Sequence, residues 1–320
     1  MVFCTLFNKN YLSRGLALYH SLAEVCEDFK LYVFAFDNDT YEVLKKLNLP
    51  ALIPVSLTEL EDEELLMVKP TRSFAEYCWT STSSTILWVL KNKNETSCTY
   101  LDADLFFYRS PHILLDEMPA SASVLITSHN YTRQYDQSAL SGKYCVQFMY
   151  FRNDENGLIA LNWWRDRCIE WCYARQEDGK FGDQKYLDDW LTRFSGVHEL
   201  QHLGCLAPWN VQQYELTHPD QKTLTVKKTK AIFDVVFFHF HGVKYFANGK
   251  FILAPRSYLL SNNFRKYFYA PYLQKLLTID KDIRERGLLR DTMGTLSLKN
   301  YLKDKFLKGH WAYIKRNLLP

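Results

Sequence analysis

The stretch TYLDADLFF, residues 99–107, places two carboxylates inside an otherwise apolar run. If this run is one strand, Asp102 and Asp104 are two residues apart and point to the same side. Ionised carboxylates among apolar neighbours are costly unless a positive charge compensates them. Mn²⁺ or Mg²⁺ is a natural partner, because both accept oxygen ligands. The alternative is a pair of solvent-facing acids at the end of a strand.

Apolar runs alternate with amphipathic stretches on both sides of this segment. Strands are predicted at 2–7, 31–36, 52–57, 98–108, 123–128 and 144–151, with helices at 12–25, 40–47, 73–91, 155–176 and 183–193. Residues 222–240 predict a hairpin or paired strands. This order favours an α/β fold, with a Rossmann-like, mixed but mostly parallel central sheet flanked by helices. Ligands of such folds bind beyond the carboxyl ends of the strands.

The composition narrows the class of protein. A chain of 320 residues with 47% hydrophobic residues can bury a substantial core. Its 39 Lys and Arg nearly balance 36 Asp and Glu, so a nucleic-acid partner is not indicated. No apolar run approaches the roughly 18 residues that span a bilayer, and the start does not resemble a signal peptide. Eight scattered cysteines predict free thiols in a cytoplasmic protein; the alternative is half a zinc site at Cys168 and Cys172.

A second informative segment is FFHFHGVK, residues 237–244. On a strand, His239 and His241 share one face, and a neutral imidazole can complete a metal site. Gly242 allows the backbone to approach a ligand closely, and Lys244 can neutralise a phosphate. The alternative is two ordinary strand histidines and a solvated lysine.

These motifs together resemble the GT-A-type nucleotide-sugar transferases, and glycosyltransferase family 8 in particular. That family includes glycogenin and bacterial lipooligosaccharide galactosyltransferases, and the likeness spans roughly residues 1–250. It implies a Mn²⁺ ion held by Asp102, Asp104 and His239, and a donor diphosphate contacted by Lys244. Lys244 follows the histidine one residue sooner than in the family, so His241 is a second candidate for this contact.

The resemblance also implies a donor-binding set around the first strands. Thr5, Asn8 and Tyr11 lie where the family cradles the nucleotide, and Asp37 lies where an acid meets the base or ribose. Ala103 and Gly242 complete this expected set. The alternatives are a plain strand–helix turn at Thr5–Tyr11 and a helix cap at Asp37.

Two further segments are candidates for contacts with the sugars. In GDQKYL, residues 182–187, Asp183 and Gln184 match the family's residues near the transferred sugar; the alternative for Asp183 is a helix N-cap. Trp209 is a candidate sugar platform and Asn210 a hydroxyl partner, with a buried loop anchor as the alternative. Gln147 stands where the family carries Asn-x-Gly and is the candidate replacement for that polar contact.

The expected activity is transfer of a sugar from a nucleoside diphosphate sugar, expected to be a UDP-sugar, to a hydroxyl of a glycan or glycolipid. The resemblance implies retention of anomeric configuration; an inverting enzyme would use Asp183 as base. One alternative is a sugar nucleotidyltransferase, although no Gly-rich basic loop is present near the N-terminus. Another is a carbohydrate-binding or scaffold protein with an inactive transferase fold.

The domain organisation is expected to change near residue 255. Residues 1–254 are predicted to form the transferase domain, and 255–320 a basic, aromatic, helical appendage. Residues 281–320 contain ten Lys and Arg, interleaved with aromatics. This pattern suits peripheral attachment to the anionic inner face of a membrane. The alternative is a solvated helix packed on the domain.

Overall fold

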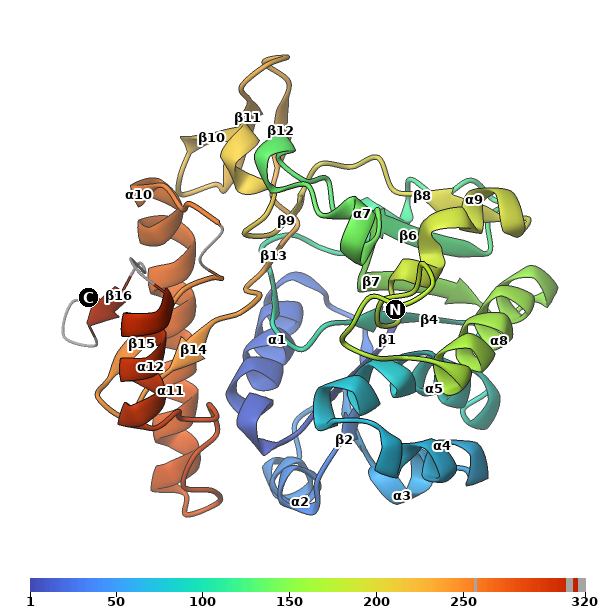
Figure 1. The fold of residues 1–320 in the computed structure, drawn as a ribbon, viewed down its shortest axis with the longest axis horizontal. Coiled ribbons are helices and arrows are strands. Elements are labelled where there is room, and N and C mark those ends of the chain that lie inside the picture. Colours follow the sequence, from blue (N-terminus) through green and yellow to red (C-terminus); the bar gives the residue numbers. More distant parts are fainter. Residues whose placement is uncertain (256–257, 309–312, 316–320) are drawn as a thin grey trace.

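The central element of the fold is a seven-stranded sheet. The computed structural model describes residues 1–255, 258–308 and 313–315, and the strand order is β3-β2-β1-β4-β7-β6-β8 (Figure 1). The strands are β1 (Val2–Phe7), β2 (Lys30–Ala35), β3 (Leu52–Ser56), β4 (Ser97–Leu101), β6 (Val124–Ser128), β7 (Tyr144–Arg152) and β8 (Val197–Glu199). Only β7 runs antiparallel to its neighbours β4 and β6. The mixed, mostly parallel sheet expected from the sequence is therefore confirmed.

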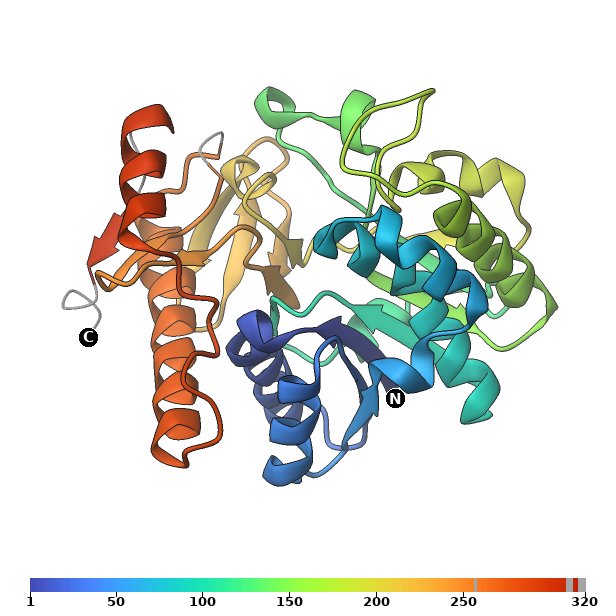
Figure 2. The same ribbon diagram turned by 60° about the horizontal axis from the view of Figure 1, so that its bottom comes forward.

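Helices cover both faces of the sheet because its central strands are apolar on both sides. On β1, Phe3 belongs to the core shared with α1 (Leu12–Val25) and α11 (Ala270–Glu285). The next residue, Cys4, belongs to the core shared with α5 (Phe74–Asn92) and α8 (Glu155–Glu170). Figure 2 shows α5 and α8 side by side over their face of the sheet.

Shorter elements connect this framework. In the first half they are η1 (Lys9–Tyr11), α2 (Asn38–Leu47), α3 (Leu57–Leu60), α4 (Glu63–Val68), η2 (Lys69–Thr71), α6 (His112–Leu115), η3 (Arg133–Tyr135) and α7 (Ser138–Ser141). They continue with η4 (Lys185–Asp189), α9 (Trp190–Arg193), η5 (Val211–Gln213), α10 (Asn262–Phe264), η6 (Arg265–Tyr269) and α12 (Leu298–Lys308). The strands β10 (Tyr214–His218), β11 (Thr223–Val226) and β12 (Ile232–Asp234) form the projecting ribbon seen in Figure 1.

The segment predicted as a single strand over 98–108 is two strands. β4 ends at Leu101, a turn covers Asp102–Asp104, and β5 (Leu105–Phe107) joins a different sheet. That sheet has the order β5-β13-β9, with β13 (Phe237–His239) antiparallel to β5 and parallel to β9 (Cys205–Leu206). The two aspartates therefore do not share a strand face, because the chain turns between two sheets at that point.

Three other predicted elements differ in extent. The helix predicted over 155–176 ends at Glu170, because Trp171 takes an extended backbone and buries its ring. Cys168 and Cys172 therefore do not share a helical face, and all eight cysteines are free. The helix predicted over 183–193 is the 3₁₀ turn η4 followed by the short helix α9. β13 ends at His239, so His241 lies beyond the strand.

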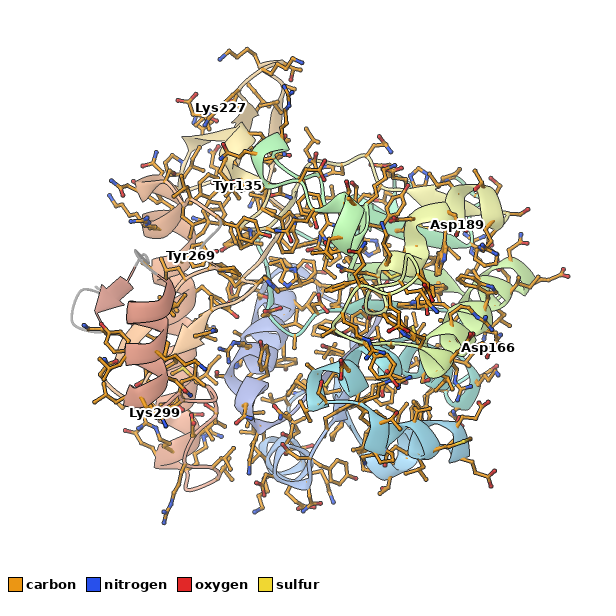
Figure 3. All side chains as sticks on the ribbon, in the orientation of Figure 1. Tyr135, Asp166, Asp189, Lys227, Tyr269 and Lys299 are labelled. Atoms are coloured by element: carbon orange, nitrogen blue, oxygen red, sulfur yellow. The ribbon has the colours of Figure 1, made fainter. Side chains whose placement is uncertain are left out.

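The C-terminal helices pack directly on the strand that carries His239. The side chains of β13 alternate, and Phe238 and Phe240 face away from the aspartate turn toward the helices. The ring of Phe240 stacks on Tyr272 at 3.7 Å, and Phe238 meets Tyr269 at 5.4 Å. Tyr269 lies on the inner side of these helices (Figure 3). The boundary near residue 255 stays a prediction.

The C-terminal tail is described only in part. Residues 309–312 and 316–320, which include Arg316 of the basic tail, lie outside the described residues. On α12, Lys299 and Lys303 are exposed while Tyr301 is buried. The strands β14 (Lys244–Tyr245), β15 (Lys250–Ile252) and β16 (Tyr313–Lys315) form a small sheet beside α12. In the described segments no helix has both the length and the apolar content to cross a bilayer.

The start of α5 allows a direct test of this fold. Ser73 and Glu76 form a reciprocal capping box, in which the Ser73 hydroxyl accepts from the Glu76 backbone N–H. We expect Ser73→Ala to lower the free energy of unfolding by about 1 kcal/mol, measured by urea denaturation. The control is Ser121→Ala, because Ser121 is exposed and its side chain has no hydrogen bond in the described structure. Equal losses in the two variants would contradict the capping role.

Candidate active site

The turn that carries Asp102 and Asp104 is held by backbone hydrogen bonds from two directions. The Asp102 N–H donates to the carbonyl of Gln147 on β7 at 3.0 Å. The Phe240 N–H donates to the carbonyl of Asp104, also at 3.0 Å. Since β5 follows this turn and pairs with β13, the register places His239 opposite Leu105 and beside Asp104. Long-range pairing thus brings the three predicted metal ligands together.

The His239 imidazole lies between the two carboxylates and a buried amide. Its Nε2 is 3.0 Å from Asp104 Oδ1 and 3.7 Å from Asp102 Oδ2. Its Nδ1 is 2.8 Å from Oε1 of Gln147, which is fully buried. An amide oxygen only accepts hydrogen bonds, so Nδ1 carries a proton and Nε2 faces the acids. Gln147 therefore fixes the orientation of the ring toward the acids.

The charges of this cluster are strongly coupled. Burial raises the pKa of Asp102 to about 6, and the neighbouring Asp104 adds to this effect. Burial also acts upward on Asp104, but the charge and hydrogen bond of His239 outweigh it and hold its pKa at about 2. Burial opposes the charge on His239, yet Asp104 raises the pKa of the imidazole well above its usual value. Without another cation, a proton on His239 compensates the acids.

The donor set of this cluster fits a divalent cation. Two carboxylates suit Mn²⁺ or Mg²⁺, and an imidazole can complete the set. In an octahedral site with bonds of about 2.0–2.1 Å, adjacent ligand atoms lie about 3 Å apart. The Nε2–Oδ1 distance of 3.0 Å between His239 and Asp104 meets this spacing. Among the described residues no group of three or more His, Cys, Asp or Glu side chains already stands in a metal-binding arrangement.

A cavity of about 330 Å³ opens beside this cluster. It is lined by Asp102, His239 and His241, by Gly182, Asp183 and Gln184, and by the aromatic residues Trp79, Tyr131, Phe181, Trp209 and Tyr258. Asp183 is buried, and its backbone carbonyl accepts a hydrogen bond from Trp164 Nε1 at 2.9 Å. Burial first, and the Asp102 charge second, raise the pKa of Asp183 to about 8. The structure thus brings Asp183 and Gln184 into one cavity with two of the predicted metal ligands.

Trp209 and Asn210 differ in their exposure to the cavity. Trp209 lines it, with its ring 5.3 Å from that of His239, and its Nε1 donates to the His129 carbonyl at 2.9 Å. Asn210 is fully buried, and its amide bonds the backbone of His129, Cys205 and Ala207. Asn210 therefore acts as a buried anchor of the loop, because its amide oxygen and nitrogen are both hydrogen-bonded to the backbone.

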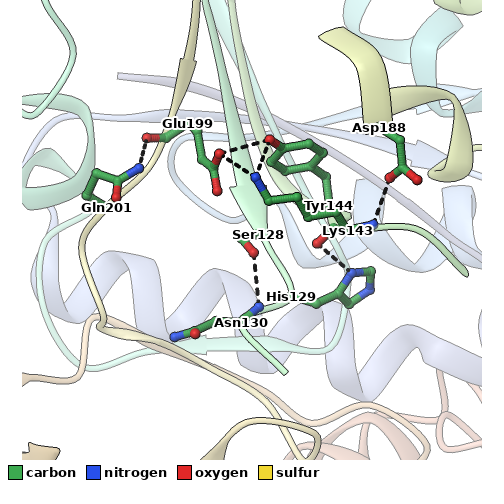
Figure 4. Close-up of polar contacts among 8 residues, drawn as sticks. All are labelled: Ser128, His129, Asn130, Lys143, Tyr144, Asp188, Glu199 and Gln201. Carbon is green, nitrogen blue, oxygen red and sulfur yellow. Dashed lines mark hydrogen bonds and ion pairs between the residues drawn. The ribbon is translucent and has the colours of Figure 1, made fainter. Parts of the chain in front are cut away.

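His129 is a cavity residue that the sequence did not single out, because a lone histidine in a loop carries no pattern. Its Nδ1 lies 3.2 Å from the carbonyl of Lys143, whose backbone N–H donates to Asp188 and whose amine pairs with Glu199 (Figure 4). Burial lowers the pKa of His129 to about 3, so the ring is neutral. It stacks on Tyr131 at 4.5 Å and supports one wall of the cavity.

The candidates around the first strands lie outside the cavity lining. Thr5 is fully buried, and its hydroxyl has no hydrogen-bond partner in the described structure. Asn8 caps η1 by accepting from the Asn10 N–H. Asp37 caps α2 by accepting from the Thr40 N–H at 2.7 Å and also accepts from the Lys9 N–H. Asn8 and Asp37 thus act as caps in this structure, and their part in a donor site stays a prediction, as does that of Tyr11, which is 40% exposed.

The residues that follow His239 are arranged by the backbone. Gly242 has a φ of +78°, and a Cβ there would lie 2.5 Å from Cδ of Pro255. Glycine is therefore required both for the left-handed conformation and for the close approach. His241 is exposed and borders the cavity, whereas Lys244 lies on β14 outside the cavity lining. Ala103 is buried within the aspartate turn.

Comparisons with known proteins agree with this fold. The chain is 34% identical to YfnF of Bacillus subtilis (strain 168) over 251 residues, which cover 76% of this chain and 81% of YfnF. It is 30% identical to YfnD of the same organism over 282 residues, covering 86% of this chain and 88% of YfnD. Both relatives are described as uncharacterized. No protein-family model matches the chain.

Solved structures extend the comparison to the fold. The galactosyltransferase LgtC in complex with donor and acceptor sugar analogs matches with a TM-score of 0.53 and 11% identity, over 90% of this chain and 100% of that chain. An active-site mutant of LgtC matches with the same TM-score and coverage, at 10% identity. Such low identities show the fold alone. The chain belongs to the family of the Bacillus subtilis proteins YfnF and YfnD, and its fold is the GT-A glycosyltransferase fold expected from its sequence.

Proposed function

We propose that this protein is a metal-dependent glycosyltransferase that moves a sugar from a nucleoside diphosphate sugar, a UDP-sugar, to a hydroxyl of a glycan or glycolipid. The observation that carries the proposal is the convergence of Asp102, Asp104 and His239 beside a cavity that also contains Asp183. The GT-A fold supports it, because ligands of such sheets bind at the carboxyl ends of the strands, where this cluster lies.

The proposed donor site has two parts. Asp102, Asp104 and His239 would hold Mn²⁺ or Mg²⁺, and a bound cation would stabilise the charge that develops on the leaving diphosphate. The donor-binding residues that we propose are Thr5, Asn8, Tyr11, Asp37, Ala103, His241, Gly242 and Lys244. His241 is favoured for a contact near the phosphates, because it is exposed at the edge of the same cavity as His239.

Asp183 and Gln184 are the proposed catalytic residues. Both line the cavity. The hydrogen bond from Trp164 Nε1 to the backbone carbonyl of Asp183 keeps this backbone in place. We infer that Asp183 orients the hydroxyls of the transferred sugar and that Gln184 lies against its reacting face, with retention of anomeric configuration. The aromatic side chains of the cavity supply apolar surface for the sugar rings.

The acceptor side of the proposal includes the C-terminal tail. We infer that the protein is cytoplasmic and attaches peripherally to an anionic membrane that carries a glycolipid acceptor. The exposure of Lys299 and Lys303 on α12 supports this inference, since an amine must be accessible to meet lipid headgroups.

The first test removes the acids one at a time. We expect Asp102→Asn and Asp104→Asn each to lower Mn²⁺-dependent hydrolysis of UDP-sugars by at least about 100-fold, because a neutral amide is a weaker ligand than a carboxylate. Unchanged circular dichroism would show that the fold is intact. Full hydrolysis by either variant, or equal hydrolysis by the wild type with and without Mn²⁺, would contradict metal dependence.

A second test addresses the partner of His239. Gln147→Leu removes the acceptor of the Nδ1 proton while keeping a side chain of similar size. We expect Mn²⁺ affinity to fall about 10–100-fold, since such partners fix the orientation of a ligating histidine. Titration of the free Mn²⁺ signal by electron paramagnetic resonance measures this affinity. An unchanged affinity would show that Gln147 does not orient a metal ligand.

A third test separates the catalytic part from the metal cluster. We expect Asp183→Asn to lower kcat about 100-fold while Mn²⁺ affinity stays near the wild-type value, because misplaced reactants lose rate rather than metal binding. Steady-state kinetics with a UDP-sugar measure kcat, and titration with Mn²⁺ measures the metal affinity. A wild-type kcat would remove Asp183 from the proposed mechanism.

A further inference from the structure

Arg14 on α1 is a buried cation without an acidic partner. Its side chain is almost fully buried, and its guanidinium donates only to backbone carbonyls. Nη1 donates to Asn10 and to Met293, each at 3.0 Å, and Nη2 donates to Val243 at 2.9 Å. The described residues offer it no carboxylate at ion-pair distance. Arg165, the other buried arginine in the described part of the chain, pairs with two acids on α4 and its N-cap.

A buried guanidinium without an anion is costly, even when carbonyl dipoles accept its hydrogen bonds. The guanidinium lies next to the loop that follows His239, because its Nη2 donates to the carbonyl of Val243. The ring of Tyr11 lies 4.4 Å from the guanidinium and covers it.

The three carbonyls belong to three segments that are far apart in the sequence. Asn10 lies in the candidate nucleotide loop after β1, and Val243 follows Gly242 in the loop after β13. Met293 lies in a turn after α11. That turn is fixed independently, since the Ser13 N–H donates to the Thr292 carbonyl at 3.0 Å and the Thr292 hydroxyl donates to Asp280 at 2.8 Å. The Arg14 side chain thus links the loop after β1, the loop after β13 and the turn after α11 through hydrogen bonds.

We propose that Arg14 is a positioning residue for the donor diphosphate. It locks the loop after β1 to the loop after β13, and its buried positive charge offsets the negative charge of the phosphates without touching them. The inference rests on the proposed function for its ligand. It deepens that proposal, because it explains how loops on separate sheets form one donor site.

The test uses Arg14→Lys, which keeps the charge but replaces the two-nitrogen fork with a single ammonium nitrogen on a shorter side chain, and Arg14→Met, which removes the charge as well. Arg165→Met is the matched control, because it also removes a buried guanidinium but lies away from the cavity lining. Calorimetry measures the affinity of the full chain for UDP and for GDP with Mn²⁺. We expect about a 10-fold loss in Arg14→Lys, a larger loss in Arg14→Met, and a change below about twofold in Arg165→Met.

Hydrogen exchange of the ligand-free proteins gives a second readout. We expect residues 8–12 and 242–245 to exchange faster together in both Arg14 variants. Residues 292–295, which Ser13 and Asp280 also hold, and the other segments should be unchanged. A folded Arg14→Met with wild-type nucleotide affinity would overturn the proposal, as would lower thermal stability without faster exchange in residues 8–12 and 242–245. If Arg14→Met does not fold, Arg14→Lys decides the question by the same criteria. If the wild type binds neither nucleotide, the proposed function fails, and hydrogen exchange still decides whether Arg14 joins the loops.

Discussion

The contact between His239 and Asp104 depends on a single strand pairing, that of β13 with β5. This pairing joins residues that are 130 or more positions apart and places an imidazole against a buried acid. Every other part of the candidate site is arranged around it. β7 supplies Gln147 to the far side of the ring, and the turn before η4 supplies Asp183 to the cavity. In the ligand-free state the imidazolium provides the compensating charge, so the cluster can be folded before a cation binds.

The arrangement of the site also explains why the fold has two kinds of sheet. The seven-stranded sheet provides a rigid edge at which β4 ends, and the small β5-β13-β9 sheet brings a histidine across that edge. If β4 and β5 were one continuous strand, Asp102 and Asp104 would lie on the same buried face of it. No second strand would then place His239 opposite them. The turn between the sheets instead brings Asp102 to the cavity lining, while Asp104 stays buried against His239.

Much of the architecture could be predicted from local patterns. The first three strands were predicted within one or two residues, because apolar runs between amphipathic helices are read from the sequence directly. The convergence of Asp102, Asp104 and His239 was expected only through family resemblance, and the local reasoning for it was wrong about the strand. The partners of Gln147, His129 and Arg14 depend on contacts across 80 or more residues or on backbone carbonyls, which no spacing rule reveals. Long-range packing, rather than local propensity, decides such roles.

The stack of Tyr272 on Phe240 gives the change of composition near residue 255 a different meaning. The basic, aromatic composition after residue 255 is typical of a separate appendage. Its aromatic rings nevertheless cover one side of β13, and His239 lies on the other side. Without these rings, the side chains of Phe238 on β13 and of Phe240 just beyond it would be bare, and such an apolar surface is prone to self-association. For this protein, the stretch that follows the change of composition also shields the strand that carries His239.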